Sequence, residues 1–400
     1  MSNEPRRAGR HFLQIPGPTP IPERILAAMS RQILDHRGLE FQKLGKRVLS
    51  GVKGLFKTAH HVIIYPSSGT GAWEAALTNT LSPGDKVLMC ETGQFAVLWA
   101  VMAQKLGLKP EVITTDWRVA VDANTIEAKL KADKAHEIKA VCVVHNETST
   151  GCRSRIDEVR KALDALKHPA LLMVDTISSL ACTDLRHDEW GIDVTVAGSQ
   201  KGMMLPPGLS FTAISDKAIT ASKTAKMPRS YFSWDDMLAN NANGFFPYTP
   251  ATGLLYGLAE AIDMINEEGL ENVFTRHERL AEATRRAAQG WGLDIQCRDA
   301  KFYSPAVTTV VMPEGHNADS FRKLVLDNFN MSLGTGLNKV AGKVFRIGHL
   351  GDTNELTIMG ALAGVEMGLE LAGVPHQKGG VAAAMSYLAE TSRVPKAVAA

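Results

Sequence analysis

The chain has 400 residues, and its 44 lysines and arginines nearly balance 42 aspartates and glutamates, which leaves a net charge of +2. This balance gives no basic surface of the kind that binds nucleic acids or anionic membranes, so neither is expected as a partner. Hydrophobic residues make up 45% of the sequence, a value typical of globular proteins. The 34 glycines and 18 prolines are close to average usage and exclude collagen-like and low-complexity classes.

The cysteines and the first residues indicate the compartment. There are five cysteines, at positions 90, 142, 152, 182 and 297, and none forms a C-x-x-C pair. An odd number without paired spacing argues against a disulfide framework and against a zinc site, so no metal is expected. The first ten residues lack the apolar segment of a secretory signal, and no apolar run approaches the roughly 20 residues that span a membrane. We therefore expect a cytoplasmic protein.

The first two-thirds of the chain predict an α/β fold. Residues 15–22 contain four prolines and predict an extended arm, after which apolar residues recur at helical spacing from Pro22 and over 41–56. Strands and helices then alternate, which predicts a parallel or mostly parallel sheet covered by helices. The predicted strands cover 62–65, 86–90, 111–114, 140–145, 170–175 and 194–197, and the helices between them include 72–81, 95–106, 124–132 and 157–166.

The pattern changes near residue 260. Two long helices are predicted over 254–268 and 270–291, and they are followed by a strand at 307–312, a helix near 318–329 and a strand at 345–347. This order is typical of an α+β unit. We therefore expect an N-terminal arm (1–22), a large domain (23–274) and a smaller C-terminal domain (275–400).

A lysine follows the predicted strand 194–197 directly, in the stretch Gly198-Ser-Gln-Lys-Gly202. A lysine that projects from a strand end into a cleft is partly desolvated, which lowers its pKa and makes it a nucleophile able to form a Schiff base. Most lysines are solvated, so this position alone favours an ordinary surface residue.

Two further features fit the same chemistry. Asp175 closes an apolar strand, at the edge where α/β sheets bind ligands, and an acid there can keep a pyridine nitrogen protonated. A role as a turn or helix-cap residue is equally compatible with its position. Ser67-Ser-Gly-Thr-Gly71 joins a strand to a helix, where small residues and free N–H groups can hold a phosphate, although a plain capped turn has the same composition. It lacks the G-K-[ST] of a nucleotide loop.

A phosphate-binding turn, an acid and a lysine 26 residues later fit one cofactor, pyridoxal 5'-phosphate. With these features the chain resembles the class V aminotransferases of pyridoxal-phosphate fold type I. Within them it is similar to the group of serine–, alanine– and aspartate–glyoxylate aminotransferases. The resemblance runs from Pro16 to Ala384. Its most specific stretches are Asp35–Arg37, Leu81–Asp85, His145–Gly151, Gly198–Lys201 and Lys343–Leu350.

The resemblance implies a large domain with a mostly parallel seven-stranded sheet between helices and a smaller C-terminal α+β domain. It implies ping-pong transfer of an amino group from L-serine, with alanine as a further donor, to glyoxylate, giving hydroxypyruvate and glycine. Aspartate–glyoxylate or alanine–glyoxylate transfer, or a pyridoxal-phosphate-dependent lyase on the same fold, are the alternatives. A nucleotide-binding α/β protein without covalent chemistry is a more distant one.

The resemblance also implies roles for individual residues. Lys201 would carry the cofactor as a Schiff base and move the proton between the substrate Cα and the cofactor, and Asp175 would pair with the pyridine nitrogen. The other residues expected at the cofactor are Ser68, Gly69, Thr70 and Gln200 at the phosphate, Thr148 at the 3-oxygen and Phe95 on the ring. In this chain Thr176 stands where the family often has glycine, next to the pyridine partner.

Arg346 lies in a short apolar strand, where a buried arginine needs an anion, and its planar fork suits the α-carboxylate of an amino acid. A structural ion pair is the alternative role. In the family, residues that match Tyr248 and Thr249 come from the partner subunit and reach the phosphate. Those that match His36 and Arg37 likewise reach the substrate. The resemblance therefore implies a homodimer with shared active sites.

Overall fold

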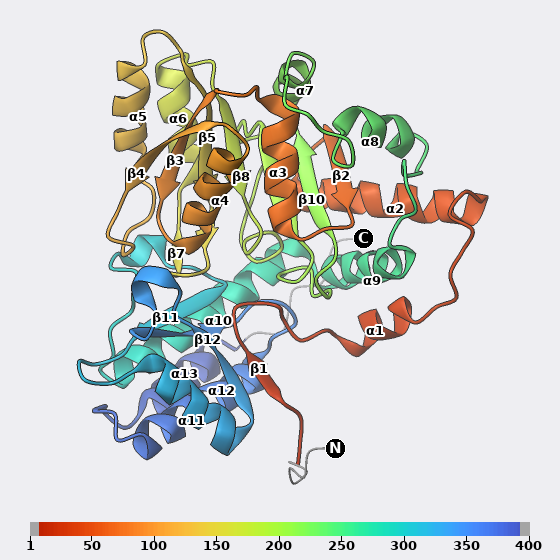
Figure 1. Cartoon of the computed structure of the whole chain (residues 1–400). Helices are drawn as coiled ribbons and strands as arrows, with labels where there is room; N and C mark the ends of the chain where they lie inside the picture. Colours follow the sequence, from red (N-terminus) through yellow and green to blue (C-terminus); the bar gives the residue numbers. More distant parts are fainter. Residues whose placement is uncertain (1–7, 393–400) are drawn as a thin grey trace.

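Seven strands between residues 61 and 214 form the larger sheet of the computed structural model, which describes residues 8–392 (Figure 1). Their order is β2-β10-β9-β8-β5-β3-β4, and all neighbouring pairs are parallel except those of β10, which is antiparallel to β2 and β9. This confirms the predicted mostly parallel, seven-stranded α/β sheet. The strands are β2 (His61–Tyr65), β3 (Lys86–Glu91), β4 (Lys109–Thr114), β5 (Ile138–Val144), β8 (Leu171–Asp175), β9 (Val194–Gly198) and β10 (Ser210–Ile214).

Side chains of successive strand residues point to opposite faces of this sheet, and both faces are buried. In β2, Val62 and Ile64 belong to one core cluster, whereas Ile63 and Tyr65 belong to the other. Helices cover each face. One layer holds α2 (Leu39–Phe56), α5 (Ala123–Ala132), α6 (Ile156–Ala165) and α9 (Thr252–Glu268), and the other holds α3 (Gly69–Thr80), α4 (Gln94–Lys105), α7 (Asp216–Ser222) and α8 (Trp234–Asn241).

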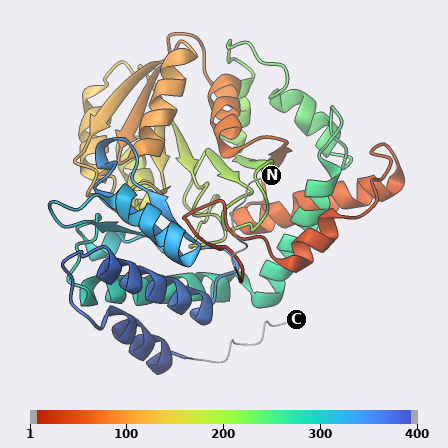
Figure 2. The same ribbon diagram turned by 60° about the horizontal axis from the view of Figure 1, so that its bottom comes forward.

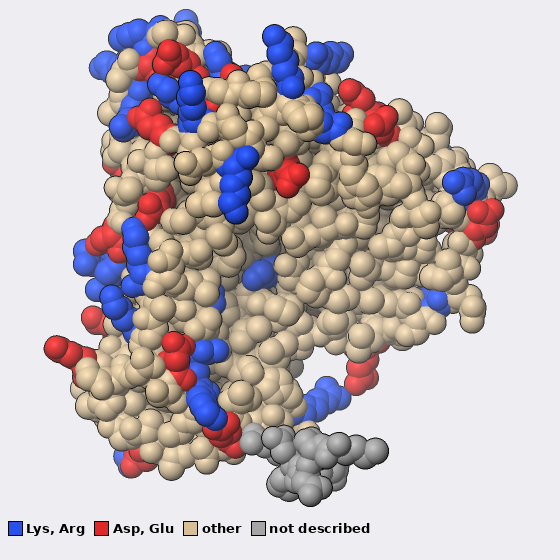
Figure 3. Space-filling model, viewed as in Figure 1, with Lys and Arg blue, Asp and Glu red and all other residues tan. Residues whose placement is uncertain are grey.

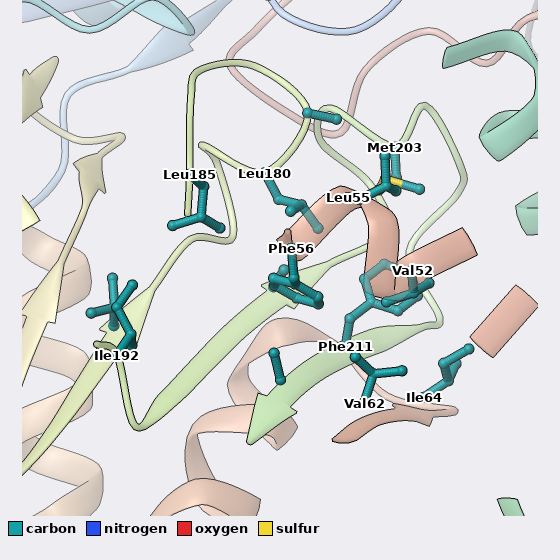
Figure 4. Packing of buried hydrophobic residues seen from close by; sticks show 14 of the residues in the cluster. Val52, Leu55, Phe56, Val62, Ile64, Leu180, Leu185, Ile192, Met203 and Phe211 are labelled. Atoms are coloured by element: carbon teal, nitrogen blue, oxygen red, sulfur yellow. The ribbon is translucent and has the colours of Figure 1, made fainter. Parts of the chain in front are cut away.

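The first core layer connects α2 to the strands and to the loops that follow them. Phe56 at the end of α2 is fully buried, and Figure 4 shows it among side chains from strands and from the segments after β8 and β9, including Leu180, Met203 and Phe211. The loops that leave the carboxyl edge of the sheet are therefore packed, which fixes the positions of the side chains that they carry.

A second sheet of four strands lies beside the first (Figures 1 and 2). Its order is β1-β12-β13-β11, with β1 parallel to β12 and the other pairs antiparallel. Helices α10, α11 and α12 pack against it, and α13 packs on α10 and α12. The elements are β1 (Phe12–Gln14), β11 (Val307–Val311), β12 (Met331–Thr335), β13 (Val344–Gly348), α10 (Leu270–Gly290), α11 (Ala318–Phe329), α12 (Glu355–Leu371) and α13 (Gly380–Glu390). A short hairpin of β6 (Asn146–Glu147) and β7 (Cys152–Arg153) follows β5, and α1 (Glu23–Met29) precedes α2.

The structure adds elements to those expected from the sequence. Helix α3 begins at Gly69, three residues before the predicted start at Ala72. The prediction began late because glycine, which stands twice in the first turn, has a low helix propensity. Strands β10 and β12 were not expected, and part of the N-terminal arm forms β1 of the smaller sheet. Helix α10 runs across position 274, and the division at 22 and 274 remains a prediction. No helix within residues 8–392 is long and apolar enough to cross a membrane.

Candidate active site

Three neighbouring strands of the large sheet deliver the predicted site residues to one edge. Asp175 is the last residue of β8, Thr148 follows β5, and Lys201 follows β9. Because β8 lies between β5 and β9 and all three are parallel, their carboxyl ends meet at the same edge. Ligands of open α/β sheets bind at such an edge. On this side Figure 3 shows a hollow with a basic side chain at its floor and mostly uncharged surface around it.

Lys201 is buried, and its Nζ donates a 2.6 Å hydrogen bond to the carbonyl oxygen of Pro16. Where the arm crosses the lysine, Gly17 has a φ of +109°, a conformation that favours glycine, and a Cβ atom there would lie 2.4 Å from this Nζ. Burial, and after it the positive charge of Arg346, lower the pKa of Lys201 to about 8, although Asp175 and Cys182 act in the opposite direction. A neutral, nucleophilic amine is therefore accessible near neutral pH.

Asp175 is 3% exposed and is held by two donors. Its Oδ1 accepts a 2.7 Å bond from the backbone N–H of Ile177, and its Oδ2 accepts a 2.9 Å bond from the indole Nε1 of Trp73. Burial raises the pKa of Asp175 to about 7, whereas both donors and Lys201 lower it. The carboxyl group is thus fixed in orientation at the end of its strand.

The turn between β2 and α3 places Ser68, Gly69 and Thr70 at the start of α3. Ser68 is the N-cap, but its side chain makes no capping hydrogen bond, which leaves the first turn of the helix open to an anion. Gly69 is tightly enclosed, since a Cβ there would meet Ile177 at 2.3 Å. The side chain of Gln200 lies nearby: a Cβ on Gly198 would be 3.1 Å from Gln200 Oε1 and 3.5 Å from the Gly69 nitrogen.

Thr148 and Arg346 are joined across the two sheets. Arg346 lies on β13 and donates from Nη1 to the carbonyl oxygen of Thr148 at 2.9 Å and from Nε to that of Thr335 at 2.7 Å. Within residues 8–392 no carboxylate lies within ion-pair distance of it, although it is only 7% exposed. Burial lowers the pKa of Arg346 to about 10, so it stays charged at neutral pH. The charge of Glu147 acts on Arg346 only from beyond ion-pair distance, and a buried cation with no carboxylate in contact is suited to bind an anionic ligand.

The Thr148 side chain is also fixed. Its Oγ1 donates to Ser178 Oγ at 2.7 Å, and that hydroxyl donates to the carbonyl oxygen of Asn146 at 2.8 Å. Phe95 lies in the first turn of α4 and packs partly buried against the core. The carboxylate of Glu147 binds the start of this helix, accepting from the Phe95 and Ala96 N–H groups at 3.4 and 3.2 Å. The loop after β5 and the predicted stacking residue are therefore held together.

The structure does not bring four predicted residues to Lys201. His36 and Arg37 lie in the loop between α1 and α2, which Figures 1 and 2 show at the outer edge of the molecule. Tyr248 stacks on Tyr231, with ring centroids 4.2 Å apart, and Thr249 beside it is exposed. The Nε2 of His36 and the hydroxyl of Tyr248 are buried and have no hydrogen-bond partner among the described residues.

The sequence reasoning missed three features of the site. Pro16 and Gly17 belong to the arm, and only the parallel pairing of β1 with β12 brings them over Lys201. Glu147 lies in the stretch His145–Gly151, which carried the family resemblance, and an acidic residue directly after a predicted strand could have been identified as a candidate site residue. Trp73 gave no signal, because an apolar residue in a helix is normally part of the core.

These residues fit pyridoxal phosphate at each of its recognisable groups. The uncapped first turn of α3 offers free N–H groups, and the neighbouring Gln200 carries an amide Nε2 that can donate, so together they can hold a phosphate. Asp175 is placed for the pyridine nitrogen, and Lys201 is an amine of lowered pKa for the aldehyde.

Comparisons with known proteins agree with this arrangement. Residues 11–347 match the family model for Aminotransferase class-V. The chain is 50% identical over 392 residues to the serine–glyoxylate aminotransferase of Methylorubrum extorquens, covering 96% of this chain and 98% of that protein. It is 46% identical over 388 residues to the L-aspartate–glyoxylate aminotransferase of Paracoccus denitrificans, with coverage of 96% and 98%. The crystal structure of pyridoxamine–pyruvate aminotransferase from Mesorhizobium loti matches with a TM-score of 0.90 at 26% identity, covering 97% of this chain and 100% of that one.

The full-length matches select among the interpretations that the sequence left open. They confirm a pyridoxal-phosphate-dependent aminotransferase of fold type I and exclude the nucleotide-binding protein without covalent chemistry. This chain belongs to the class-V aminotransferase family.

Proposed function

We propose that the chain transfers an amino group from L-serine to glyoxylate in a ping-pong reaction that gives hydroxypyruvate and glycine. The observation that carries the reaction type is the buried Lys201, with its lowered pKa, between the charges of Asp175 and Arg346. The choice of donor is supported by the relative named serine–glyoxylate aminotransferase, which is 50% identical. Aspartate is the second candidate donor, since a relative with that activity in its name is 46% identical.

The cofactor supplies an aldehyde and an electron-accepting ring when bound. In our proposal Ser68, Gly69, Thr70 and Gln200 hold its phosphate. The other contacts come from the carboxyl edge of the sheet and from α4. Asp175 pairs with the pyridine nitrogen, Thr148 contacts the 3-oxygen and Phe95 stacks on the ring.

Lys201 would hold the cofactor aldehyde through Nζ, and when the amino group of the substrate takes that place the released amine would act as the base that removes the proton from the substrate Cα. Both tasks need a neutral amine. Burial and the neighbouring Arg346 cation both disfavour the ammonium form, which is why the pKa lies near 8 and not near its ordinary value of 10.5. The carbonyl of Pro16 accepts a hydrogen bond from the free amine of Lys201 and so fixes the position of Nζ.

Arg346 binds the α-carboxylate of the amino acid and of the 2-oxo acid. Its carbonyl contacts to Thr148 and Thr335 fix the plane of the guanidinium, so that the remaining N–H groups can bind the carboxylate. This bond orients the Cα–H bond of the substrate toward Lys201 and makes both half-reactions use one carboxylate site.

The partner in our proposal is a second copy of the chain. Leu26, Ile33 and Leu39 are exposed apolar side chains in and around α1 and the start of α2. The face over α2, α8 and α9 carries few charged side chains (Figure 3). The unpartnered polar atoms of His36 and Tyr248 support the proposal that these two residues, with Arg37 and Thr249, complete the site of the partner subunit.

Wild-type enzyme is expected to use L-serine with glyoxylate at least about tenfold better, in kcat/KM, than L-aspartate or L-alanine. Aspartate carries a second carboxylate that requires a second cation, and alanine lacks the hydroxyl that a serine site would bind. The measurement is initial rates with each donor at saturating glyoxylate, with pyruvate as the control acceptor. A clear preference for aspartate would select the second candidate instead.

Lys201→Ala should lose on the order of 10⁴ in turnover, because it removes the base at Cα. Lys217→Ala, which changes an exposed lysine near the opposite end of the sheet, is the control and should keep full activity.

Attachment of pyridoxal phosphate to wild-type apoenzyme should accelerate as pH rises through about 8, since only the deprotonated amine reacts. Borohydride reduction followed by peptide mapping checks the site, and an adduct on another lysine would contradict the assignment.

Arg346→Gln should raise KM for both serine and glyoxylate roughly tenfold to a hundredfold, the usual range for a lost hydrogen bond to a charged group, while pyridoxal phosphate still binds. Because a positive charge is removed beside Lys201, the pKa of the lysine should rise, and cofactor attachment should require higher pH. Arg322→Gln is the matched control, as Arg322 also donates to a strand carbonyl of the small sheet, that of Leu333 at 2.7 Å. Loss of cofactor in Arg346→Gln would point to a different role.

Ile33→Asp should dissociate the dimer and weaken cofactor binding together, because it places a charge on an apolar side chain that is 69% exposed in the single chain. Sedimentation should give about twice the 43.3 kDa chain mass for wild type and one chain mass for the variant. Leu356→Asp, at a position that is 82% exposed on α12, is the matched control and should remain dimeric. A monomeric, fully active wild type would refute the shared site.

A further inference from the structure

The indole of Trp73 makes the one side-chain hydrogen bond that the described residues give to Asp175. Its Nε1 donates to Asp175 Oδ2 at 2.9 Å, and both side chains are almost fully buried, with exposed fractions of 2% and 3%. The indole N–H is a donor only and does not titrate in the physiological range. The carboxylate oxygen that it contacts must therefore act as an acceptor.

This contact favours the ionised form of Asp175. Burial acts the other way, because a carboxylate loses hydration when it leaves water, and the negative charge of Glu147 adds to this effect, while the positive charge of Lys201 opposes it. The pKa of Asp175 is about 7 as the net result. The N–H groups of Ile177 and Trp73 replace part of that hydration, one at each oxygen. A hydrogen bond from a neutral donor to a buried charge is among the stronger ones in proteins.

Trp73 is itself held rigidly and belongs to the same helix as the phosphate-binding turn. It lies one turn beyond Gly69 in α3, and its ring stacks on that of Trp99, with centroids 5.7 Å apart and planes 13° apart. The start of α3 thus meets one end of the cofactor site, while its second turn fixes the acid at the other end.

We propose that Trp73 is a positioning residue that keeps Asp175 ionised and oriented toward the cofactor ring. The inference rests on the proposed role of Asp175, and it gives α3 a second task beyond holding phosphate. The charge that the acid presents to a pyridine nitrogen is then set by a residue that does not touch the cofactor. Loss of the indole N–H leaves a buried carboxyl that is more easily protonated and less well aligned.

Trp73→Phe removes the donor and keeps an aromatic ring, and Trp99→Phe is the matched control. Both tryptophans are buried and stacked on each other, but the Trp99 Nε1 has no hydrogen-bond partner among the described residues. The two variants therefore lose similar packing, and only Trp73→Phe loses a bond to Asp175. Similar thermal unfolding shifts for the two would show that packing is matched.

The measurement is binding of pyridoxamine phosphate to apoenzyme between pH 5.5 and 9, by equilibrium dialysis, since this ligand has the same ring but cannot attach to Lys201. Trp73→Phe should raise Kd at pH 7.5 by roughly tenfold or more. The affinity should also begin to fall at a higher pH than in wild type, because the pKa of Asp175 rises in the variant. Trp99→Phe should leave both unchanged. Equal binding curves for the two variants would overturn the inference and leave the proposed function standing.

Two further measurements separate the inference from its premise. In an Asp175→Asn background, Trp73→Phe should change Kd by less than about twofold, because the charge that it supports is gone. If Asp175→Asn binds pyridoxamine phosphate as tightly as wild type, the role of Asp175 and this inference both fail. In wild-type apoenzyme with ¹⁵N-labelled tryptophan, the Trp73 indole signal should shift with pH as Asp175 titrates. A signal that does not shift would overturn the inference even if Trp73→Phe fails to fold.

Discussion

The burial of four charged side chains at the carboxyl edge of the large sheet is the constraint on which the rest of the site depends. Lys201 and Arg346 are basic, Asp175 and Glu147 are acidic, and all four side chains are buried. Burying one such charge alone is very costly, whereas groups of opposite sign offset each other when they lie close together. Each of these four groups also has hydrogen bonds that fix it: Lys201 to Pro16, Asp175 to Trp73 and Ile177, Arg346 to two carbonyls and Glu147 to the start of α4.

This constraint explains why the smaller sheet and the N-terminal arm belong to the same site. The arm enters the small sheet as β1, next to β12, and its next residues then cross Lys201. The crossing leaves no room for side chains below it: a Cβ on Gly348 would lie 2.2 Å from the Ile15 carbonyl oxygen, and one on Gly334 would lie 2.7 Å from Pro16. Gly334 lies on β12 and Gly348 on β13, and β13 also carries Arg346. Water is thus excluded from Lys201 by the arm, whose Pro16 is 185 residues away in sequence.

Sequence patterns reached the part of this arrangement that depends on local order. Alternating strands and helices predict the sheet, and parallel strands bring their carboxyl ends together, so Asp175 and Lys201 could be placed at one edge before the fold was known. The site residues taken from the family stay predictions of role, although the structure does bring Thr148 and Arg346 together. What sequence alone could not give is the contact between distant segments. Pro16 over Lys201 depends on β1 pairing with β12, and Trp73 on Asp175 depends on how α3 packs on the sheet.

The working state of the site requires a neutral Lys201 and an ionised Asp175, and the pKa values of about 8 and about 7 set when both hold. At pH well below both values the two groups are protonated, and well above both the amine is neutral while the carboxylate stays ionised. Two neighbours move the pair toward that last state. The Arg346 cation lowers the pKa of Lys201, and the Trp73 indole lowers that of Asp175, so each widens the pH range in which its neighbour has the required charge. Arg346 comes from the small sheet and Trp73 from α3, and the protonation state of the site therefore depends on the packing of both against the edge of the large sheet.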